Sequence, residues 1–596
     1  MKIQSTVSML YILLGAMQPT SAEPACGPLR NVYFGDLHLH TSFSFDAYII
    51  GTETTPDQAY RFARGEPVNY MGHRMQRRWP LDFMAVTDHA ENLGIASEIK
   101  DPESAFSKTD SGRRIRWAYF LGKKEGDKVF WDVEWEKDYK QLDPKGVASA
   151  WQKEIKAANT NYRPGTFTTF IAYEWSTMVD VQYHFHRNVI FKGDSAPLPF
   201  SAVDSKRPED LWTYLETNRK RGIEALAIPH TADLSNGLMY DWNDSYGKPI
   251  DQGYALRRVL NEPLSEISQI KGQSETHPLL SLNDEFAKYE IMSMGNIHGS
   301  YVREAYGRGL VLGARTGANP YQFGIVGGSD IHSGLSLSDA EPYGEMHLLF
   351  CDASDGAITS PSEFATGNLT GVWAERNTRD SIYEALRRKE TFATSGSRLK
   401  IRFFGGWNFS QDILNKTCWW TMAYAKGVPM GGDLPKMSAH ENSPTFIVDV
   451  LKDPDGANLD RAQIVKVWRE GDEYREKVFD VVWSDRRIPD HATNRLPVVG
   501  NTVDLKNGSY TNTIGAVELK GMWVDPEFSA KNAAVYYLRV LEIPTPRWST
   551  VNAVRIGSAL PSDVPAVVQQ RGWSSPIWYN APAPQVLASG RDLTTE

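Results

Sequence analysis

The chain has 596 residues, of which 41% are hydrophobic and 11% aromatic, and this composition excludes an intrinsically disordered protein. The formal net charge of −9 is spread over both signs without a long run of Lys or Arg, so we expect no nucleic acid as a partner. The length predicts two domains, although one β/α barrel can absorb roughly 250 to 400 residues. The oligomeric state stays open.

The N-terminus has the pattern of a secretory signal peptide. Lys2 precedes the apolar segment Val7–Met17, and the small residues 20–22 suit cleavage by signal peptidase. We therefore expect residues 1–22 to be removed and the mature protein to be periplasmic or secreted. A buried helix is the alternative, because the basic region contains a single Lys. No later run approaches the roughly 20 apolar residues of a membrane span.

Three cysteines occur, Cys26, Cys351 and Cys418, so at most one disulfide can form within the chain. Cys26 also lies close enough to the predicted cleavage site to suggest a lipid anchor. Glu23, however, stands where a lipid-anchoring signal carries an aliphatic residue.

Strand-like runs rich in β-branched and aromatic residues alternate with helical stretches through the first 400 residues. The predicted strands are Val32–Phe34, Leu81–Val86, Thr166–Ala172, Asn188–Phe191, Ala225–Ile228, Tyr289–Met292 and Phe323–Val326. The predicted helices include Pro56–Arg64, Val147–Ala158, Pro208–Arg221 and Asp380–Lys389. This alternation predicts an α/β fold with a largely parallel sheet, and seven strands are enough to close a barrel over residues 23–400.

Two long segments, about 91–146 and 231–286, interrupt this alternation. Each is much longer than the usual connection between a strand and a helix. We expect them to form lids or substrate walls. The alternative is that each is an extra surface hairpin or helix pair without a catalytic role.

After residue 400 the pattern changes to strands with few helices between them. These strands are predicted at Lys400–Phe404, Thr445–Leu451, Ile464–Arg469, Lys477–Val482, Ala516–Leu519 and Val535–Leu541. They indicate a mostly antiparallel accessory domain over residues 401–555. The tail, residues 556–596, is predicted to pack back on the barrel.

Histidines and carboxylates follow several of the predicted strands, where a β/α barrel builds its active site. Eleven of the thirteen histidines precede residue 350. His38 and His40 come after the first strand, and their one-residue gap places both side chains on the same side of an extended chain. The other candidates at strand ends are His89, Glu174, His230, Asp330 and His332. A single such motif is weak evidence, but five at equivalent strand ends indicate a metal centre.

The sequence resembles the PHP (polymerase and histidinol phosphatase) superfamily of metal-dependent hydrolases, and most closely its exported DUF3604 branch. The resemblance covers roughly residues 30–400 and the tail phrase RGWSSPIWY. It is carried by NVYFGDLHLHTSFSFDAY, PLDFMAVTDHAENLG, FIAYEWS, HRNVIF, GGSDIHSGL and TFATSGSR. It implies a distorted (β/α)7 barrel and a metal site, and it implies little about the substrate.

The resemblance also implies three groups of ligands. The first is His38, His40, Glu174 and Asp330; the second is Asp46, His89 and His332; the third is His186 and His230, bridged by Glu174. Such a set of histidines and carboxylates suits two or three Zn, Mn or Fe ions better than Mg or Ca. Asp46 stands where some relatives carry His, which leaves the metal identity open.

Three further residues are candidates for other roles near the ligands. His184 lies two residues before His186 and could replace it as a ligand. His298 could face the cleft as an acid or a substrate contact, or could be a structural histidine. Asp88 is expected to orient a ligand by accepting a hydrogen bond.

A metal cluster of this type lowers the pKa of a bridging water, so no serine or cysteine nucleophile is needed. The sequence contains no Gly-x-Ser-x-Gly elbow, P-loop or dinucleotide motif that would indicate another chemistry. We therefore predict a hydrolase of small-molecule esters, with Glu174, Asp330 and His298 as catalytic candidates. Phosphate mono- or diesters are the first expectation. Carboxylic ester, amide, phosphotriester or sulfate ester hydrolysis, or a non-catalytic binding protein, are the alternatives.

Overall fold

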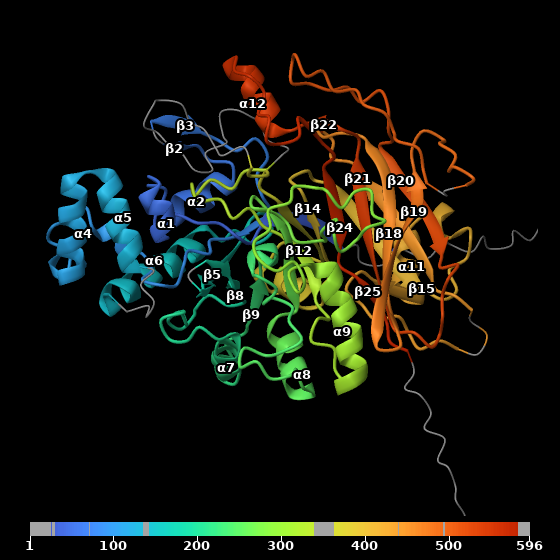
Figure 1. The fold of residues 1–596 in the computed structure, drawn as a ribbon, viewed down its shortest axis with the longest axis horizontal. Coiled ribbons are helices and arrows are strands. Elements are labelled where there is room, and N and C mark those ends of the chain that lie inside the picture. The colour runs from blue at the N-terminus through green and yellow to red at the C-terminus, as the bar shows by residue number, and fades with distance from the viewer. Residues whose placement is uncertain are drawn as a thin grey trace, which may run out of the picture.

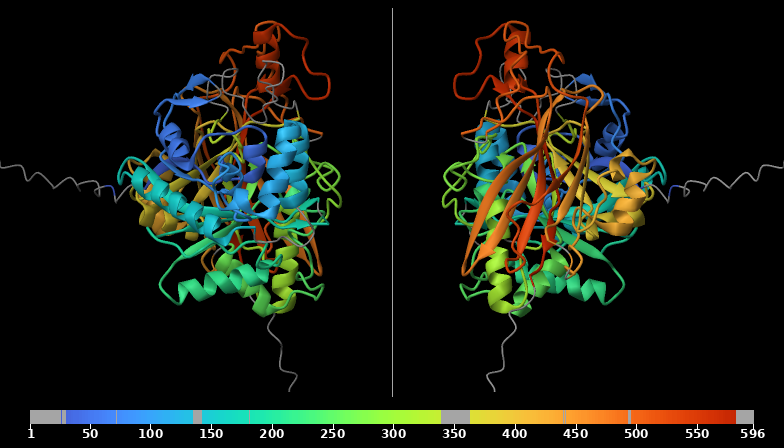
Figure 2. Two further views of the ribbon diagram at one scale, coloured as in Figure 1. Left: turned by 90° about the vertical axis from the view of Figure 1, so that its left-hand side faces the viewer. Right: turned by 90° about the vertical axis from the view of Figure 1, so that its right-hand side faces the viewer.

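The structure, a computed structural model, describes residue 26 and residues 30–70, 72–134, 142–180, 182–338, 363–438, 440, 442–492 and 495–581. The predicted signal peptide, Cys351 and the last residues of the tail lie outside this part of the chain. Several helices of the first half lie at one end of the molecule, on the left in Figure 1, and antiparallel strands of the second half form the opposite end (Figures 1 and 2). No helix among the described residues is long and apolar enough to cross a membrane.

Five strands of the N-terminal half form one arm of a 12-stranded sheet, in the order β1-β4-β5-β8-β9. Their bounds are Asn31–Asp36, Phe83–Ala85, Thr168–Trp175, Arg187–Phe191 and Ala225–Pro229. The first three are parallel, whereas β8 runs antiparallel to both β5 and β9. All five strands coincide with predicted ones, because each is a short β-branched or aromatic run bounded by turn residues.

The expected closed barrel is not present in the hydrogen-bonded ladders of the described residues. Strands β10 (Leu264–Gln269), β11 (Gly272–Gln273) and β12 (Gly324–Gly327) form a separate three-stranded sheet. Among the described residues, the segment after β12 joins the segment after β1 through an isolated parallel bridge between Leu39 and Ile331, not through a continuous ladder.

The prediction of a strand at residues 289–292 was also wrong, because no described strand lies there. Instead, β10 lies in the segment 231–286, which we expected to form an insertion. Its sequence, LSEISQ, has polar residues at four of six positions and gives a weak strand signal, yet all six are buried. Buried polar side chains, of which Glu266 and Gln269 contact the candidate ligands His38 and Asp330, explain why hydrophobic periodicity did not reveal this strand.

The other arm of the large sheet continues through antiparallel strands, in the order β1-β13-β14-β24-β21-β18-β19. Their bounds after β1 are Leu369–Ala374, Thr391–Thr394, Arg571–Ser574, Ala534–Glu542, Leu459–Glu470 and Glu473–Trp483. The expectation of a largely parallel sheet is therefore wrong for the described chain. The tail strand β24 pairs with both β14 and β21, so the sheet runs without a break from the first half into the second.

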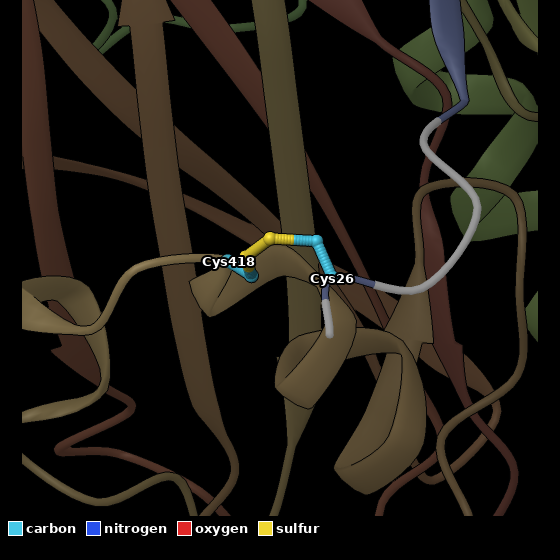
Figure 3. The surroundings of a disulfide bond; sticks show 2 residues. All are labelled: Cys26 and Cys418. Carbon is cyan, nitrogen blue, oxygen red and sulfur yellow. A yellow bond between two sulfur atoms is a disulfide. The ribbon is translucent and has the colours of Figure 1, made fainter. Parts of the chain in front are cut away.

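A four-stranded antiparallel sheet, in the order β16-β15-β17-β20, packs on this second arm. Its strands are Gly427–Pro429, Lys400–Gly406, Thr445–Leu451 and Glu518–Val524. A disulfide joins Cys26 to Cys418, next to helix α11 (Trp419–Lys426), with the two Cα atoms 5.4 Å apart (Figure 3). The remaining short strands are β2 Val68–Tyr70, β3 His73–Met75, β6 Met178–Val179, β7 Tyr183–His184, β22 Thr545–Pro546, β23 Val567–Val568 and β25 Ile577–Tyr579.

The four helices predicted from the sequence are present as α2 (Pro56–Ala63), α6 (Pro144–Asn161), α7 (Pro208–Arg219) and α10 (Arg379–Arg387). Thr55 and Gln58 close a reciprocal capping box at the start of α2, which satisfies backbone N–H groups at its first turn. The other helices are α1 Phe45–Ile49, α3 Ile95–Glu98, α4 Asp110–Leu121, α5 Lys123–Glu134, α8 Gln252–Asn261, α9 Val302–Thr316 and α12 Trp548–Ile556.

Candidate metal centre

Strand ends bring most of the candidate ligands together. Backbone hydrogen bonds from Asp330 N to His38 O, at 2.8 Å, and from His40 N to Ile331 O, at 2.9 Å, hold the segments after β1 and β12 side by side. The side chains of His38 and His40 are fully buried, and that of Glu174 at the end of β5 is 1% exposed. The fold therefore gathers distant parts of the sequence into one buried cluster.

The first predicted group meets around Glu174 Oε2. This oxygen lies 3.2 Å from His38 Nε2 and 3.1 Å from His40 Nε2. Asp330 Oδ1 lies 3.3 Å from the same two nitrogen atoms. Asp330 has a φ of 54°, in the left-handed region that non-glycine residues rarely adopt, so the backbone is strained at a predicted ligand.

The second group meets around Asp46, which helix α1 carries. Asp46 Oδ2 lies 3.2 Å from His89 Nε2 and 2.9 Å from His332 Nε2. The structure adds His40 to this group, since its ligand atom lies within 4.8 Å of the other three and its ring stacks on His332 at 4.2 Å between centroids. His40 thus lies between the first and second groups.

The third group uses the other oxygen of Glu174. Glu174 Oε1 lies 2.7 Å from His186 Nδ1 and 3.3 Å from His230 Nε2. The two oxygens of Glu174 therefore face different groups, which is the geometry that a bridging carboxylate needs. His184 lies with its ring 4.7 Å from that of His186, and its buried Nδ1 has no hydrogen-bond partner among the described residues.

These three groups fit divalent cations. In each, nitrogen and oxygen ligand atoms of three or four side chains lie within 4.8 Å of one another. His230 Nδ1 is buried without a hydrogen bond to the described chain. Burying carboxylates is costly unless cations neutralise them, and imidazole nitrogen with carboxylate oxygen is the donor set that Zn, Mn and Fe prefer.

The carboxylates of the cluster are held in the ionised form. Burial would raise the pKa of Glu174, but the nearby His89 and His230 hold that pKa well below its usual range. Burial would also raise the pKa of Asp330, but Lys271 and His38 hold that pKa well below its usual range. A carboxylate must be ionised to bind a metal ion, and the direction of both pKa shifts meets this requirement.

Side chains around the cluster orient the imidazole rings. Glu266 on β10 lies 3.1 Å from His38 Nδ1, and the Ser44 hydroxyl lies 2.8 Å from His40 Nδ1. Asp88 accepts hydrogen bonds from Thr41 N at 2.6 Å and from the Ser44 hydroxyl at 2.7 Å. Asp88 thus acts on His40 through Ser44, as expected for a residue outside the ligand set.

Sequence reasoning missed the contribution of β10. Gln269 Nε2 donates to Asp330 Oδ2 at 2.7 Å, and the ammonium of Lys271 forms an ion pair with the same carboxylate. Gly328 leaves room for the Glu266 carboxylate, because a Cβ atom at residue 328 would lie 2.1 Å from Glu266 Oε2. The signal that could have revealed them is the cluster of Glu266, Gln269 and Lys271 in one short segment.

The cluster opens on a cavity of about 260 Å³. Its lining comprises Asp46, Ile49, Ile50, His89, Glu174, Met178, His184, His186, Lys271, Asp330 and His332. The structure does not bring His298 to this cavity. The side chain of His298 is 62% exposed, and its Nδ1 lies 3.0 Å from Glu304 Oε1. Nothing in this position supports a catalytic role for His298.

Comparison with known proteins adds a family and one distant structure. No curated protein matches the chain. A crystal structure of a two-domain protein containing a predicted PHP-like metal-dependent phosphoesterase, from Bacteroides vulgatus, is similar at 12% identity and a TM-score of 0.30. The match covers 89% of this chain and 96% of the other. The sequence profile of the family described as protein of unknown function DUF3604 matches residues 27–581, so the chain belongs to the DUF3604 family, as its motifs predicted.

Proposed function

We propose that this protein is an exported hydrolase that uses two or three divalent metal ions to cleave phosphate mono- or diesters. The observation that carries the proposal is the set of three adjoining ligand groups, which share His40 and Glu174 and open on one cavity. Adjoining groups of this kind suit multi-metal hydrolysis, in which more than one ion contacts the reacting ester.

Zn, Mn or Fe are the ions proposed, because six histidines stand beside three carboxylates in the ligand set. The first ion would be held by His38, His40, Glu174 and Asp330. Asp46, His89 and His332 would hold the second, and His186 and His230 with Glu174 the third. When bound, the ions would activate water and polarise the oxygen of the ester.

The chain's own groups would position the substrate and keep the site dry. Lys271 places a positive charge on the cavity lining, beside Asp330. An anionic phosphoryl group would find an electrostatic partner there. Ile49, Ile50 and Met178 supply apolar lining that limits the access of water. Glu266 and Ser44 would keep His38 and His40 in the orientation that ligation requires.

Export is supported by two independent features of the chain. The signal-like pattern of residues 1–22 is the first. The second is the disulfide between Cys26 and Cys418, since disulfides persist in oxidising compartments and are rare in the cytosol. A Cys26 sulfur in a disulfide is also not available for a lipid thioether.

Two alternatives stay open within this proposal. Hydrolysis of a carboxylic ester, an amide, a phosphotriester or a sulfate ester would use the same ions, but the charge of Lys271 favours an anionic substrate over a neutral one. A binding protein without activity would need no such complete set of ligands.

The test is a screen of the metal-loaded protein against phosphomonoesters, phosphodiesters, phosphotriesters, carboxylic esters and sulfate esters. Elemental analysis of the same sample gives the ions and their number. We expect two or three ions per chain and turnover of a phosphate mono- or diester. Turnover confined to neutral esters, or a chain that binds no divalent ion, would refute the proposal.

A further inference from the structure

A second cavity lies against helix α1, next to the metal centre. It has a volume of about 390 Å³. The residues that line it are Tyr48, Ile49, Gly51, Thr52, Glu53, Ile99, Lys100, Arg116, Tyr119 and Asp127. Ile49 also lines the metal cavity, so one side chain belongs to both.

Helix α1 explains how the two cavities come to adjoin. Asp46 and Ile49 are three positions apart on α1 and therefore share a helix face, and both line the metal cavity together with Ile50, which follows the helix. Tyr48, the residue before Ile49 on the helix, lines the second cavity. The helix that supplies a predicted metal ligand thus also supplies the boundary between the two spaces.

The far wall of the second cavity comes from the segment 91–146. Ile99 follows α3, and Tyr119 lies on α4. One apolar cluster joins these helices to α1, and it extends to Met178 on the lining of the metal cavity. Of the two roles considered for this segment, the geometry favours a wall of the site over a surface addition.

The lining has the chemistry of a site for an apolar group. Tyr48, Ile49, Ile99 and Tyr119 contribute rings and aliphatic chains. Several polar groups at the cavity are paired with one another. The Tyr119 hydroxyl donates to Asp127 Oδ1 at 2.8 Å, and Lys100 forms an ion pair with Glu53.

Mostly apolar cavities of roughly 300 to 1,000 Å³ with a few polar groups are typical binding sites for small molecules. We propose that the second cavity binds the apolar, aromatic part of an ester whose anionic centre lies at the metal cluster beside Lys271. This proposal rests on the function proposed above and deepens it. Ile49 would then act as a specificity residue, since it separates the space for the reacting group from the space for the aromatic group.

Phenylphosphonate and methylphosphonate test the proposal, because they share an anionic head and differ in the group that the second cavity would hold. Calorimetry on the metal-loaded protein should show that the phenyl compound binds roughly tenfold or more tightly. Ile49→Trp should remove this preference by filling the boundary. Tyr119→Ala should reduce it by removing part of the far wall. Ile556→Trp, at a position on α12 that is 55% exposed, is the matched control and should keep it.

Equal binding of the two phosphonates by the wild type, or an unchanged preference in both cavity variants, overturns the proposal. If neither phosphonate binds, the phosphate chemistry fails and the cavity is judged separately with the fluorescent arene 1-anilinonaphthalene-8-sulfonate. The cavity assignment is supported if Ile49→Trp lowers the fluorescence of the bound arene and Ile556→Trp leaves it unchanged. Equal fluorescence in both variants overturns it.

Discussion

Two regions of this molecule bury many charged side chains, and they neutralise them in different ways. Around the ends of β1, β5 and β12, carboxylates face imidazoles, with Lys271 as an additional cation. Between α9 and β21, carboxylates face arginines: Arg303 Nη2 lies 2.6 Å from Glu275 Oε1, and Arg539 Nη2 lies 2.7 Å from Asp284 Oδ1.

The difference is between a cluster that could bind metal ions and one that the chain neutralises by itself. Guanidinium groups stay charged at any ordinary pH, so the arginine cluster is balanced by the chain itself. Imidazoles can lose their charge, so a cluster of them around carboxylates could take up metal ions as its balancing charge. The arginine cluster instead connects the segment 231–286 to α9 and β21, which holds the two halves of the chain together.

The largest expected effect is at the metal cluster. Asp330→Ala or Glu174→Gln should abolish turnover and lower the bound metal, because each variant removes a ligand and Glu174 also bridges. Elemental analysis, circular dichroism and a rate assay on each variant check this. His298→Ala is the control and should retain both metal and rate, since His298 is exposed and paired with Glu304. Full metal content with unchanged rates in both ligand variants would contradict the assignment.

The arginine cluster should respond in stability. Arg539→Met leaves Glu275 and Asp284 short of a buried cation, and breaking such a pair costs about 3 to 5 kcal/mol of unfolding free energy. Denaturant unfolding measures the loss. Arg475→Met, which breaks exposed pairs with Glu470 and Glu473, should cost less than about 1 kcal/mol. Equal losses in the two variants would show that the buried cluster does not stabilise the fold.

The same cluster should confer a dependence on acid pH. Burial would raise the pKa of Glu275, but Arg539 and Arg303 lower it to about 2. A lowered pKa stabilises the fold above the unfolded value of 4.5, and this contribution disappears as the pH falls toward about 2. The stability difference between wild type and Glu275→Gln should therefore shrink as the pH falls over that range. A difference that stays constant with pH would count against the pairing.

A smaller effect is expected from residues that orient the metal ligands. Glu266→Ala removes the carboxylate beside His38 Nδ1, and such changes weaken metal binding by about 10- to 100-fold. Competition with a chelator measures the affinity. Glu285→Ala, at a carboxylate that pairs with Arg461, is a control and should leave the affinity unchanged.

The smallest effect is expected in the C-terminal half. His440 and His491 are its only histidines, and both are exposed, so His440→Ala together with His491→Ala should change neither metal content nor rate. Elemental analysis of the double variant checks this. Loss of a stoichiometric ion would place part of the metal centre in that half.

Local sequence predicted the individual strands and helices better than their assembly. Runs such as Ala225–Pro229 combine apolar side chains with a sharp stop, and this information lies within a few residues. The direction of β8 and the pairing of β24 between β14 and β21 depend on contacts across the whole chain. A largely parallel closed barrel was therefore expected where the described residues form a mostly antiparallel sheet whose ladder does not close.

The sequence by itself determined which side chains could bind metal, because a histidine or carboxylate directly after a strand is placed at the strand end by local geometry. Only the tertiary structure decided how they combine: it set Glu174 between two groups, added His40 to a second group, and left His298 exposed. It also brought Glu266 to the cluster from a strand that periodicity did not reveal, and Lys271 from the turn that follows that strand. The physical reason is that ligand type is a property of one residue, whereas distances between residues hundreds of positions apart arise from packing.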